Sequence, residues 1–270
     1  MHLTGGVRVP TVLTYHSDVV RQQSLMRLYS PLMWRFVRDM THVVTTSPNY
    51  LATSPVLQAI SDRVEVIPIG LDSSSYPEPS EMNLERVRRE VGENFFLFVG
   101  VLRYYKGLHI LLDAAAGTNL PVVIAGAGPV EDELRSRAQA LGLTNIFFLG
   151  HVSDGWKVAL FRLCRAVVFP SHMRSEAFGV SLVEGAMFGR PLISAEIGTG
   201  TTYVNADGHS GIVVRPGDAM ELRAAMERLY GDDELTEKLG AGARSRYEQL
   251  FTGARMAKAY QELYHQLIGT

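Results

Sequence analysis

Two glutamates at a fixed spacing are the residues of this chain best suited to chemistry. Glu176 and Glu184 lie eight residues apart in the stretch Phe169–Pro191, where a predicted strand ends in a polar loop and a predicted helix follows at about Val180–Phe188. Helical rise puts the two carboxylates roughly 10–12 Å apart, about the span from a sugar across a diphosphate to a ribose. The backbone N–H groups of Ala177 to Val180 start the helix without intrahelical acceptors, which suits an anionic diphosphate. The pattern favours binding of a nucleotide-linked sugar.

Other motifs for nucleotides, metals and nucleophiles are missing from the sequence. The P-loop pattern GxxxxGK[ST] is absent, and GAGPVE at Gly126–Glu131 has Glu131 where a dinucleotide fingerprint needs its third glycine. The HExxH, CxxC, DxD and GxSxG patterns are absent as well. We therefore expect no metal and no cofactor, and an α/β-hydrolase is disfavoured.

Composition narrows the classes of function further. The 270 residues hold 26 Lys and Arg against 28 Asp and Glu, a net charge of −2, which speaks against a strongly basic nucleic-acid binder. A single cysteine, Cys164, cannot form an internal disulfide and sits in an apolar run typical of the core, so a reducing compartment is favoured. No run approaches the ~18 apolar residues of a membrane span, and the first ten residues lack the apolar region of a signal peptide. We expect a cytoplasmic protein, or one bound to a membrane surface from the cytoplasm.

Short apolar runs alternate with helical patterns along almost the whole chain. Near-continuous apolar strands separated by helices are typical of parallel sheets covered on both faces, so the predicted fold class is α/β. The predicted strands are Thr11–Tyr15, His42–Thr46, Val64–Ile67, Phe95–Val99, Val122–Ala125, Ile146–Leu149, Ala166–Phe169, Leu192–Ser194 and Ile212–Val214.

A Ser- and Pro-rich stretch, Leu71–Asn83, is the expected linker between two lobes. It leaves three predicted strands and two predicted helices before it, few for a doubly wound sheet, so we expect the first lobe to be incomplete and the chain to be an N-terminally short form of a longer enzyme. The predicted division is 1–75 for a partial acceptor lobe, 76–251 for a nucleotide-sugar lobe, and 252–270 for a helix that packs back toward the first lobe.

The Glu176–Glu184 segment resembles the E-x7-E signature of retaining, nucleotide-sugar-dependent glycosyltransferases of family 4. The resemblance continues in order through most of the chain, in VIPIGLD (Val66–Asp72), FVGVLRYYKGLHILLDA (Phe98–Ala114), VIAGAGP, FFLGHVSD and AEIGTGTTYVNADGHSGIVV. LRYYKGL and the last stretch particularly resemble mannosyltransferase-like enzymes of bacterial surface-polysaccharide assembly. The family implies the GT-B fold, with two Rossmann-like doubly wound lobes.

Roles for individual residues follow from the matched positions. Glu184 would bind the ribose hydroxyls, and Glu176 would bind sugar hydroxyls near the anomeric carbon. Lys106 would neutralise the leaving diphosphate, with Arg103 as a second phosphate contact. Arg103 replaces an arginine that the family often has at the position of Val101. The remaining donor contacts implied are Val152 beside the base, through its backbone, and the backbone of Ala177, Phe178, Gly179 and Val180.

In the first lobe, VLTYHSDV places His16 just past a predicted strand, where it resembles the family histidine that faces the reaction centre. Its catalytic role is implied by the resemblance, and Asp18 could help to orient it. The Gly-rich loop that normally opens the acceptor lobe is not convincingly present, since Gly5 and Gly6 have no strand before them.

Residues 1–60 hold five Arg, no Lys, two Asp and no Glu, a net charge of +3. Four of the arginines are interleaved with apolar residues, a pattern that can lie on an anionic membrane surface or form an ordinary solvated helix face. These four are Arg21, Arg27, Arg35 and Arg38.

The expected function is metal-independent, retaining transfer of a hexosyl unit, mannose-like by preference, from a GDP- or UDP-linked sugar to a glycan or lipid-linked glycan. No residue is an obvious covalent nucleophile. Two alternatives stay open from the sequence: a non-hydrolysing sugar-nucleotide epimerase, which the E-x7-E helix disfavours, and a nucleotide-sugar-binding module without transfer activity, which the short first lobe favours.

Overall fold

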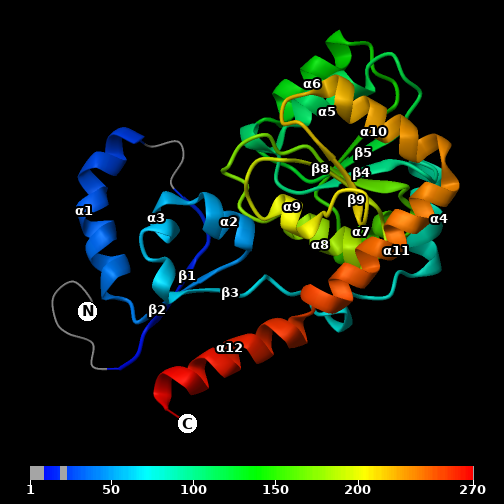
Figure 1. Cartoon of the computed structure of the whole chain (residues 1–270). Helices are drawn as coiled ribbons and strands as arrows, with labels where there is room; N and C mark the ends of the chain where they lie inside the picture. Colours follow the sequence, from blue (N-terminus) through cyan, green and yellow to red (C-terminus); the bar gives the residue numbers. More distant parts are fainter. Residues whose placement is uncertain (1–8, 19–22, 270) are drawn as a thin grey trace.

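The computed structural model describes residues 9–18 and 23–269, and its side chains at 9–18 and 28–269. The chain forms two lobes joined by two crossings (Figure 1). The strands are β1 (Val12–Tyr15), β2 (His42–Thr45), β3 (Val64–Val66), β4 (Phe96–Val99), β5 (Val122–Ala125), β6 (Ile146–Gly150), β7 (Ala166–Phe169), β8 (Leu192–Ala195) and β9 (Gly211–Val214). The α-helices are α1 (Gln23–Asp39), α2 (Pro48–Thr53), α3 (Pro55–Gln58), α4 (Glu81–Glu90), α5 (Leu108–Ala115), α6 (Glu131–Ala140), α7 (Asp154–Leu163), α8 (Val180–Met187), α9 (Thr201–Val204), α10 (Ala219–Gly231), α11 (Asp233–Leu250) and α12 (Gly253–Ile268). Short 3-10 turns are η1 (Ser61–Arg63), η2 (Ser73–Ser75) and η3 (Tyr104–Lys106).

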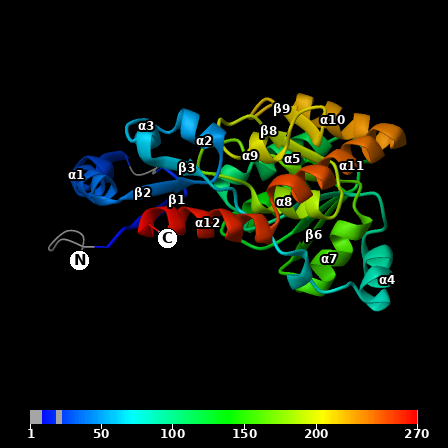
Figure 2. The same cartoon turned by 60° about the horizontal axis from the view of Figure 1, so that its bottom comes forward.

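The N-terminal lobe is a parallel sheet in the order β1-β2-β3, covered on both faces. Neighbouring residues of a strand point to opposite faces, and the central strand β2 shows this directly. Val43 packs in a cluster with Met33 and Val37 of α1, whereas Val44 packs with Leu263 of α12. The last helix therefore covers the face of this sheet opposite α1–α3, and Figure 2 shows it running beneath the strands.

The C-terminal lobe is a six-stranded parallel sheet in the order β6-β5-β4-β7-β8-β9. Here too the side chains alternate: Phe96 and Phe98 of β4 belong to one apolar core and Leu97 to the other. The chain first builds outward from β4 through β5 to β6, then returns to place β7 on the other side of β4. The neighbouring strands β4 and β7 thus form the topological switch point, where open α/β sheets bind their ligands beyond the carboxyl ends.

Two segments cross between the lobes and are hydrogen-bonded to each other. The Leu71 N–H donates to the Phe251 carbonyl at 2.9 Å, and the Gly253 N–H donates to the Leu71 carbonyl at 2.8 Å. Gly70 fits here because it has no Cβ, which would lie 2.3 Å from the Thr252 carbonyl oxygen. The outgoing chain and the chain that returns into α12 consequently share one narrow connection.

The α/β prediction is confirmed, and each predicted strand lies within one residue of the observed one at either end. The linker is shorter than the predicted Leu71–Asn83, because α4 already begins at Glu81. Ser80 caps this helix, and its side chain accepts from the Asn83 N–H at 3.3 Å. Within residues 9–18 and 23–63, the first lobe has three α-helices before β3 rather than two, since a serine caps each of two short helices, α2 and α3. Among the described helices, none combines the length and the apolar character needed to cross a membrane.

Candidate functional site

Lys106 and Glu176 meet at the switch point of the large sheet. Lys106 ends η3 in the segment after β4, and Glu176 lies in the loop after β7, so the neighbouring strands deliver the two side chains to the same edge. The Lys106 ammonium donates to Glu176 Oε2, and the Ser171 hydroxyl donates to the same oxygen at 3.3 Å. Both charged side chains are close to nine-tenths buried, at 12% and 11% exposed. A charged hydrogen bond at this depth fixes the lysine and the carboxylate against each other.

The pairing of Lys106 with Glu176 depends on the close approach of the loops that follow β4 and β7. Gly107, which follows Lys106, has φ +70°, a conformation that favours glycine. A Cβ at Gly107 would lie 1.9 Å from the Pro170 carbonyl oxygen at the end of β7. Only a residue without a side chain allows the β4 and β7 loops to approach this closely.

The start of α8 lies beside this ion pair and presents free donors. Gly179 caps the helix with φ +92°, and the backbone N–H groups of residues 177–180 have no acceptor among the described residues. The Phe178 side chain is buried in the core against Phe251, and Ala177 packs in the cluster that contains Tyr50 and Met33 of the N-terminal lobe. The backbone N–H groups of this segment and the exposed Val180 are therefore the groups that can contact a ligand.

Glu184 lies further along α8, and two residues that the sequence analysis did not single out hold its carboxylate. The Tyr76 hydroxyl and the Lys157 ammonium both donate to Oε1 at 2.9 Å, and the residue is 6% exposed. Burial, reinforced by the charge of Glu184, raises the pKa of the Tyr76 phenol. Burial opposes the charge of Lys157, but its hydrogen bond to Glu184 and the carboxylate charge outweigh it and raise the pKa of Lys157. Lys157 lies in the first turn of α7, the helix after β6. A lysine at this position, near the carboxyl end of a strand of a parallel sheet, is the sequence signal that could have marked it as a site residue.

The remaining predicted donor contacts line the same edge of the sheet. Arg103 comes just before η3 and is exposed, and it borders a cavity of about 200 Å³ that Tyr104, His109 and Glu133 also line. Val152 follows β6 and packs in part against one of the two cores. The structure thus places Arg103 and Val152 on the loops that follow β4 and β6. The Lys106 N–H donates to the Arg103 carbonyl at 3.0 Å, so Arg103 contacts the Lys106–Glu176 pair through its backbone.

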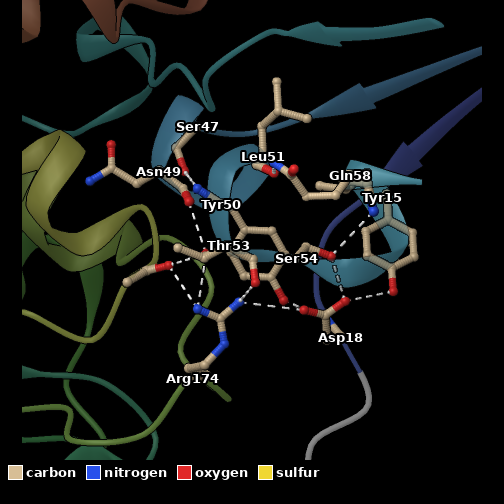
Figure 3. Close-up of polar contacts among 12 residues, drawn as sticks. Tyr15, Asp18, Ser47, Asn49, Tyr50, Leu51, Thr53, Ser54, Gln58 and Arg174 are labelled. Carbon is tan, nitrogen blue, oxygen red and sulfur yellow. Dashed lines mark hydrogen bonds and ion pairs between the residues drawn. The ribbon is translucent and has the colours of Figure 1, made fainter. Parts of the chain in front are cut away.

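The N-terminal lobe contributes His16, which lies at the carboxyl end of β1. Its imidazole is exposed, and none of the described residues is hydrogen-bonded to it. The idea that Asp18 orients this histidine is wrong, because the Asp18 carboxylate is held elsewhere. It accepts from Tyr15 at 2.9 Å and Ser54 at 2.7 Å, and it pairs with Arg174 at 3.5 Å (Figure 3).

Two of the four arginines of the basic stretch can be placed. Arg35 and Arg38 are exposed on α1 and line a shallow hollow with Pro31, Trp34 and Asp39. The Arg38 guanidinium lies 5.3 Å from the centre of the Trp34 ring. The Arg21 residue and the Arg27 side chain lie outside the described part of the chain.

No group of three or more His, Cys, Asp or Glu residues within 9–18 and 23–269 is arranged to hold a metal ion.

Comparison with known proteins gives matches over nearly the whole chain. The family model described as glycosyl transferases group 1 matches residues 81–246. The D-rhamnosyltransferase WbpZ of Pseudomonas aeruginosa is 54% identical over 252 residues, which are 93% of this chain and 66% of that protein. The O-antigen chain mannosyltransferase C of Escherichia coli is 50% identical over 268 residues, which are 99% of this chain and 72% of that protein. The chain therefore spans about two thirds of the length of these relatives.

Solved structures share the fold. Anabaena HepE in complex with UDP superposes with a TM-score of 0.81 at 25% identity, covering 96% of this chain and 72% of that one. WaaG, a glycosyltransferase involved in lipopolysaccharide biosynthesis, gives a TM-score of 0.72 at 19% identity, covering 97% of this chain and 76% of that one.

Proposed function

The chain belongs to the glycosyl transferases group 1 family and has the GT-B fold, and from that premise we propose that it is a retaining hexosyltransferase. The donor is a nucleoside diphosphate sugar, GDP- or UDP-linked, and the acceptor is a glycan or lipid-linked glycan of O-antigen assembly. A mannose-like sugar is supported by the names of the two similar proteins, a D-rhamnosyltransferase and a mannosyltransferase, because D-rhamnose is 6-deoxymannose.

The observation that carries this proposal is the Lys106–Glu176 pair beside the free N–H groups of residues 177–180. Glu176 can accept hydrogen bonds from the hydroxyls of the donor sugar, and Lys106 faces the position of the diphosphate. As the bond from the anomeric carbon to the diphosphate oxygen breaks, its electron pair leaves with the diphosphate. Lys106 and the positive end of α8 then stabilise that charge. The acceptor oxygen forms the new bond on the same face, and its proton passes to the leaving diphosphate.

Glu184 fits the nucleoside end of such a donor. Tyr76 and Lys157 both donate to Oε1, so Oε2 is left to accept from a ribose hydroxyl. Holding one oxygen in advance fixes the carboxylate before the ligand arrives, which lowers the entropic cost of binding. The spacing of Glu176 and Glu184 then matches the two ends of one nucleotide sugar.

The test combines donor binding with transfer. We expect calorimetric titration with nucleoside diphosphates to show binding, and Glu176→Gln to lower transfer about 100-fold or more while nucleoside diphosphate affinity changes less than about threefold. Glu227→Gln, on an exposed position of α10, is the control and keeps full transfer. Unchanged transfer in Glu176→Gln would remove this residue from the site. Isomerisation of the donor sugar without acceptor would instead identify an epimerase.

Catalysis without a divalent ion is part of the proposal, because Lys106, Arg103 and the start of α8 supply positive charge toward the diphosphate. Transfer measured with EDTA is expected to equal transfer with Mg²⁺. Activity that is lost with the chelator and restored by Mg²⁺ would contradict it.

A membrane-surface location for the acceptor is supported by α1. Leu28 and Leu32 are 83% and 47% exposed on this helix, one turn apart, and Arg35 follows on the same stripe. Apolar and basic side chains on one face suit the headgroup region of anionic lipid. We expect the chain to co-sediment with vesicles of anionic phospholipid but not with neutral ones, and Leu32→Glu to weaken this binding. Equal binding of Leu32→Glu and the parent would show that α1 is not the contact.

A further inference from the structure

Three segments from both lobes meet at Arg174, two residues before Glu176 in the same loop. Arg174 Nη1 donates to the Gly198 carbonyl and to Thr53 Oγ1, both at 2.9 Å, and Nη2 donates to the Thr53 carbonyl at 3.3 Å. Gly198 lies in the loop after β8, and Thr53 ends α2 in the N-terminal lobe. Figure 3 shows the guanidinium reaching into the turn of α2 from the other lobe. One side chain thus bridges the lobes beside the proposed donor site.

In the N-terminal lobe, Arg174 pairs with the carboxylate of Asp18, which other residues hold in place. Asp18 lies 3.5 Å from Arg174 Nη2 and is 17% exposed, while the arginine side chain is 32% exposed. Hydroxyls of Tyr15 and Ser54 hold Asp18 Oδ1, and the Asp18 N–H donates to Tyr50 at 2.5 Å, so the carboxylate is fixed whether or not the arginine is present. The arginine therefore docks against a rigid acceptor.

In the C-terminal lobe, the loop that accepts a hydrogen bond from Arg174 is also held in place. Glu196 Oε1 accepts from the Gly198 N–H at 2.8 Å, which fixes the turn whose carbonyl receives Arg174. The Gly200 N–H donates to the Ala177 carbonyl at 2.9 Å, and a Cβ at Gly200 would lie 2.5 Å from the Phe178 ring. The loop after β8 is thereby locked onto the segment that carries the free N–H groups of the site.

We propose, on the basis of the function proposed above, that Arg174 is a positioning residue that couples closure of the two lobes to the placement of Glu176. With the lobes together, the guanidinium contacts Thr53, Gly198 and Asp18 at once, and the loop that carries Glu176 is held at both sides. When the lobes part, the contacts to Thr53 and Asp18 are lost and the one to Gly198 remains. The loop that carries Glu176 is then held at one side only, so the Lys106–Glu176 pair is positioned less precisely for transfer. Among the described residues, the hydrogen bonds and ion pairs of the Arg174 side chain go to Thr53, Gly198 and Asp18 and not to Lys106 or Glu176.

Lysine cannot replace this arginine fully. The planar guanidinium presents donors in a fork that reaches several acceptors together, whereas an ammonium is a single point. Arg174→Lys keeps the charge that faces Asp18 but cannot span Thr53 and Gly198. We expect it to fall between the parent and Arg174→Met in every measurement below.

The experiment measures lobe arrangement and transfer separately in the full chain. Spin labels are attached in the variant Asp62→Cys and Lys238→Cys, at one exposed position in the N-terminal lobe and one in the C-terminal lobe. The native Cys164 is 1% exposed, and burial raises the pKa of its thiol to about 12, so it stays unlabelled. Arg215→Met is the matched control, because it removes an exposed arginine with two carboxylate partners inside one lobe.

We expect Arg174→Met to broaden the distribution of interlobe distances and to lower kcat about tenfold or more, with donor KM changed less than about threefold. Arg215→Met should leave both unchanged. Thr53→Val, which removes one hydroxyl and keeps the shape of α2, should broaden the distribution to a smaller extent.

A distribution in Arg174→Met as narrow as in the parent would overturn the proposal, as would a broadened one with kcat unchanged. If no donor sugar is transferred by the parent, the proposed function fails, and the distance distribution still decides whether Arg174 holds the lobes together.

Discussion

Two lysines at the site contact two different carboxylates, and under the proposed function they would face different parts of the donor. Lys106 pairs with Glu176 at the switch point, whereas Lys157 pairs with Glu184, the residue proposed to bind the ribose. The contribution of Lys106 should therefore depend on the phosphates of the ligand, and that of Lys157 should not.

We predict that Lys106→Met weakens binding of a nucleoside diphosphate about tenfold or more while binding of the corresponding nucleoside changes less than about threefold, because a charged contact to phosphate is lost. Lys157→Met is the matched variant, and it should weaken both ligands by a similar factor. Calorimetric titration of both variants with both ligands checks this. Parallel losses for the two ligands in Lys106→Met would take the lysine away from the diphosphate.

At the scale of elements, the close approach of the β4 and β7 loops depends on Gly107. Gly107→Ala adds a Cβ that would lie 1.9 Å from the Pro170 carbonyl oxygen, in addition to the strain of a positive φ. We predict a loss of about 3 kcal/mol or more in the free energy of unfolding, measured by urea denaturation.

Gly92→Ala separates the effect of a positive φ from the effect of a close contact. Gly92 also has a positive φ, +83°, but no atom lies within 4 Å of the position that a Cβ would take there, so it should lose only about 1 kcal/mol. Equal losses in the two variants would mean that the loops adjust to the added methyl group and that their contact does not fix the site.

Strands were predictable because each is a short, nearly continuous apolar run bounded by polar or glycine-rich turns. β5 and β7 begin and end where the sequence predicts. The E-x7-E spacing likewise located both carboxylates, and the fold brings Lys106 to one of them. Their roles in transfer stay predictions.

Contacts between residues far apart in the sequence could not be predicted from such local patterns. Tyr76 lies 108 residues from Glu184, in a stretch that shows only Ser and Pro as its local signal. Arg174 lies in the analysed loop, but its partners Thr53 and Asp18 are 121 and 156 residues away. No spacing within one element encodes such pairs, because they form only when segments far apart in the sequence fold against each other.

At the scale of the whole molecule, the N-terminal sheet depends on a helix from the far end of the chain. Leu263 of α12 is 1% exposed and packs with Val44 and Ile67. We predict that Leu263→Ala lowers the stability of the N-terminal lobe by about 2–4 kcal/mol, because the cavity it leaves lies under the central strand. Hydrogen exchange should accelerate at β1, β2 and β3, while β4 and β7 keep their protection.

Glu262→Ala, at the exposed neighbouring position, serves as the control and should leave exchange in both lobes unchanged. Faster exchange in β4 and β7 of Leu263→Ala would show that the lobes unfold as one unit rather than separately.

The paired crossings at Leu71 and Gly253 form one narrow connection, so we expect the lobes to rotate relative to each other about an axis through it. That axis passes beside the donor half of the site, because Phe251, just before the return crossing, packs on Phe178 at 6.1 Å between ring centres. Groups near an axis hardly move during a rotation, whereas the facing lobe swings through an arc. Nucleotide affinity should therefore be independent of the angle between the lobes, and the alignment of the acceptor should depend on it. A donor can accordingly bind to the open enzyme first, and the angle then sets the rate at which an acceptor is used.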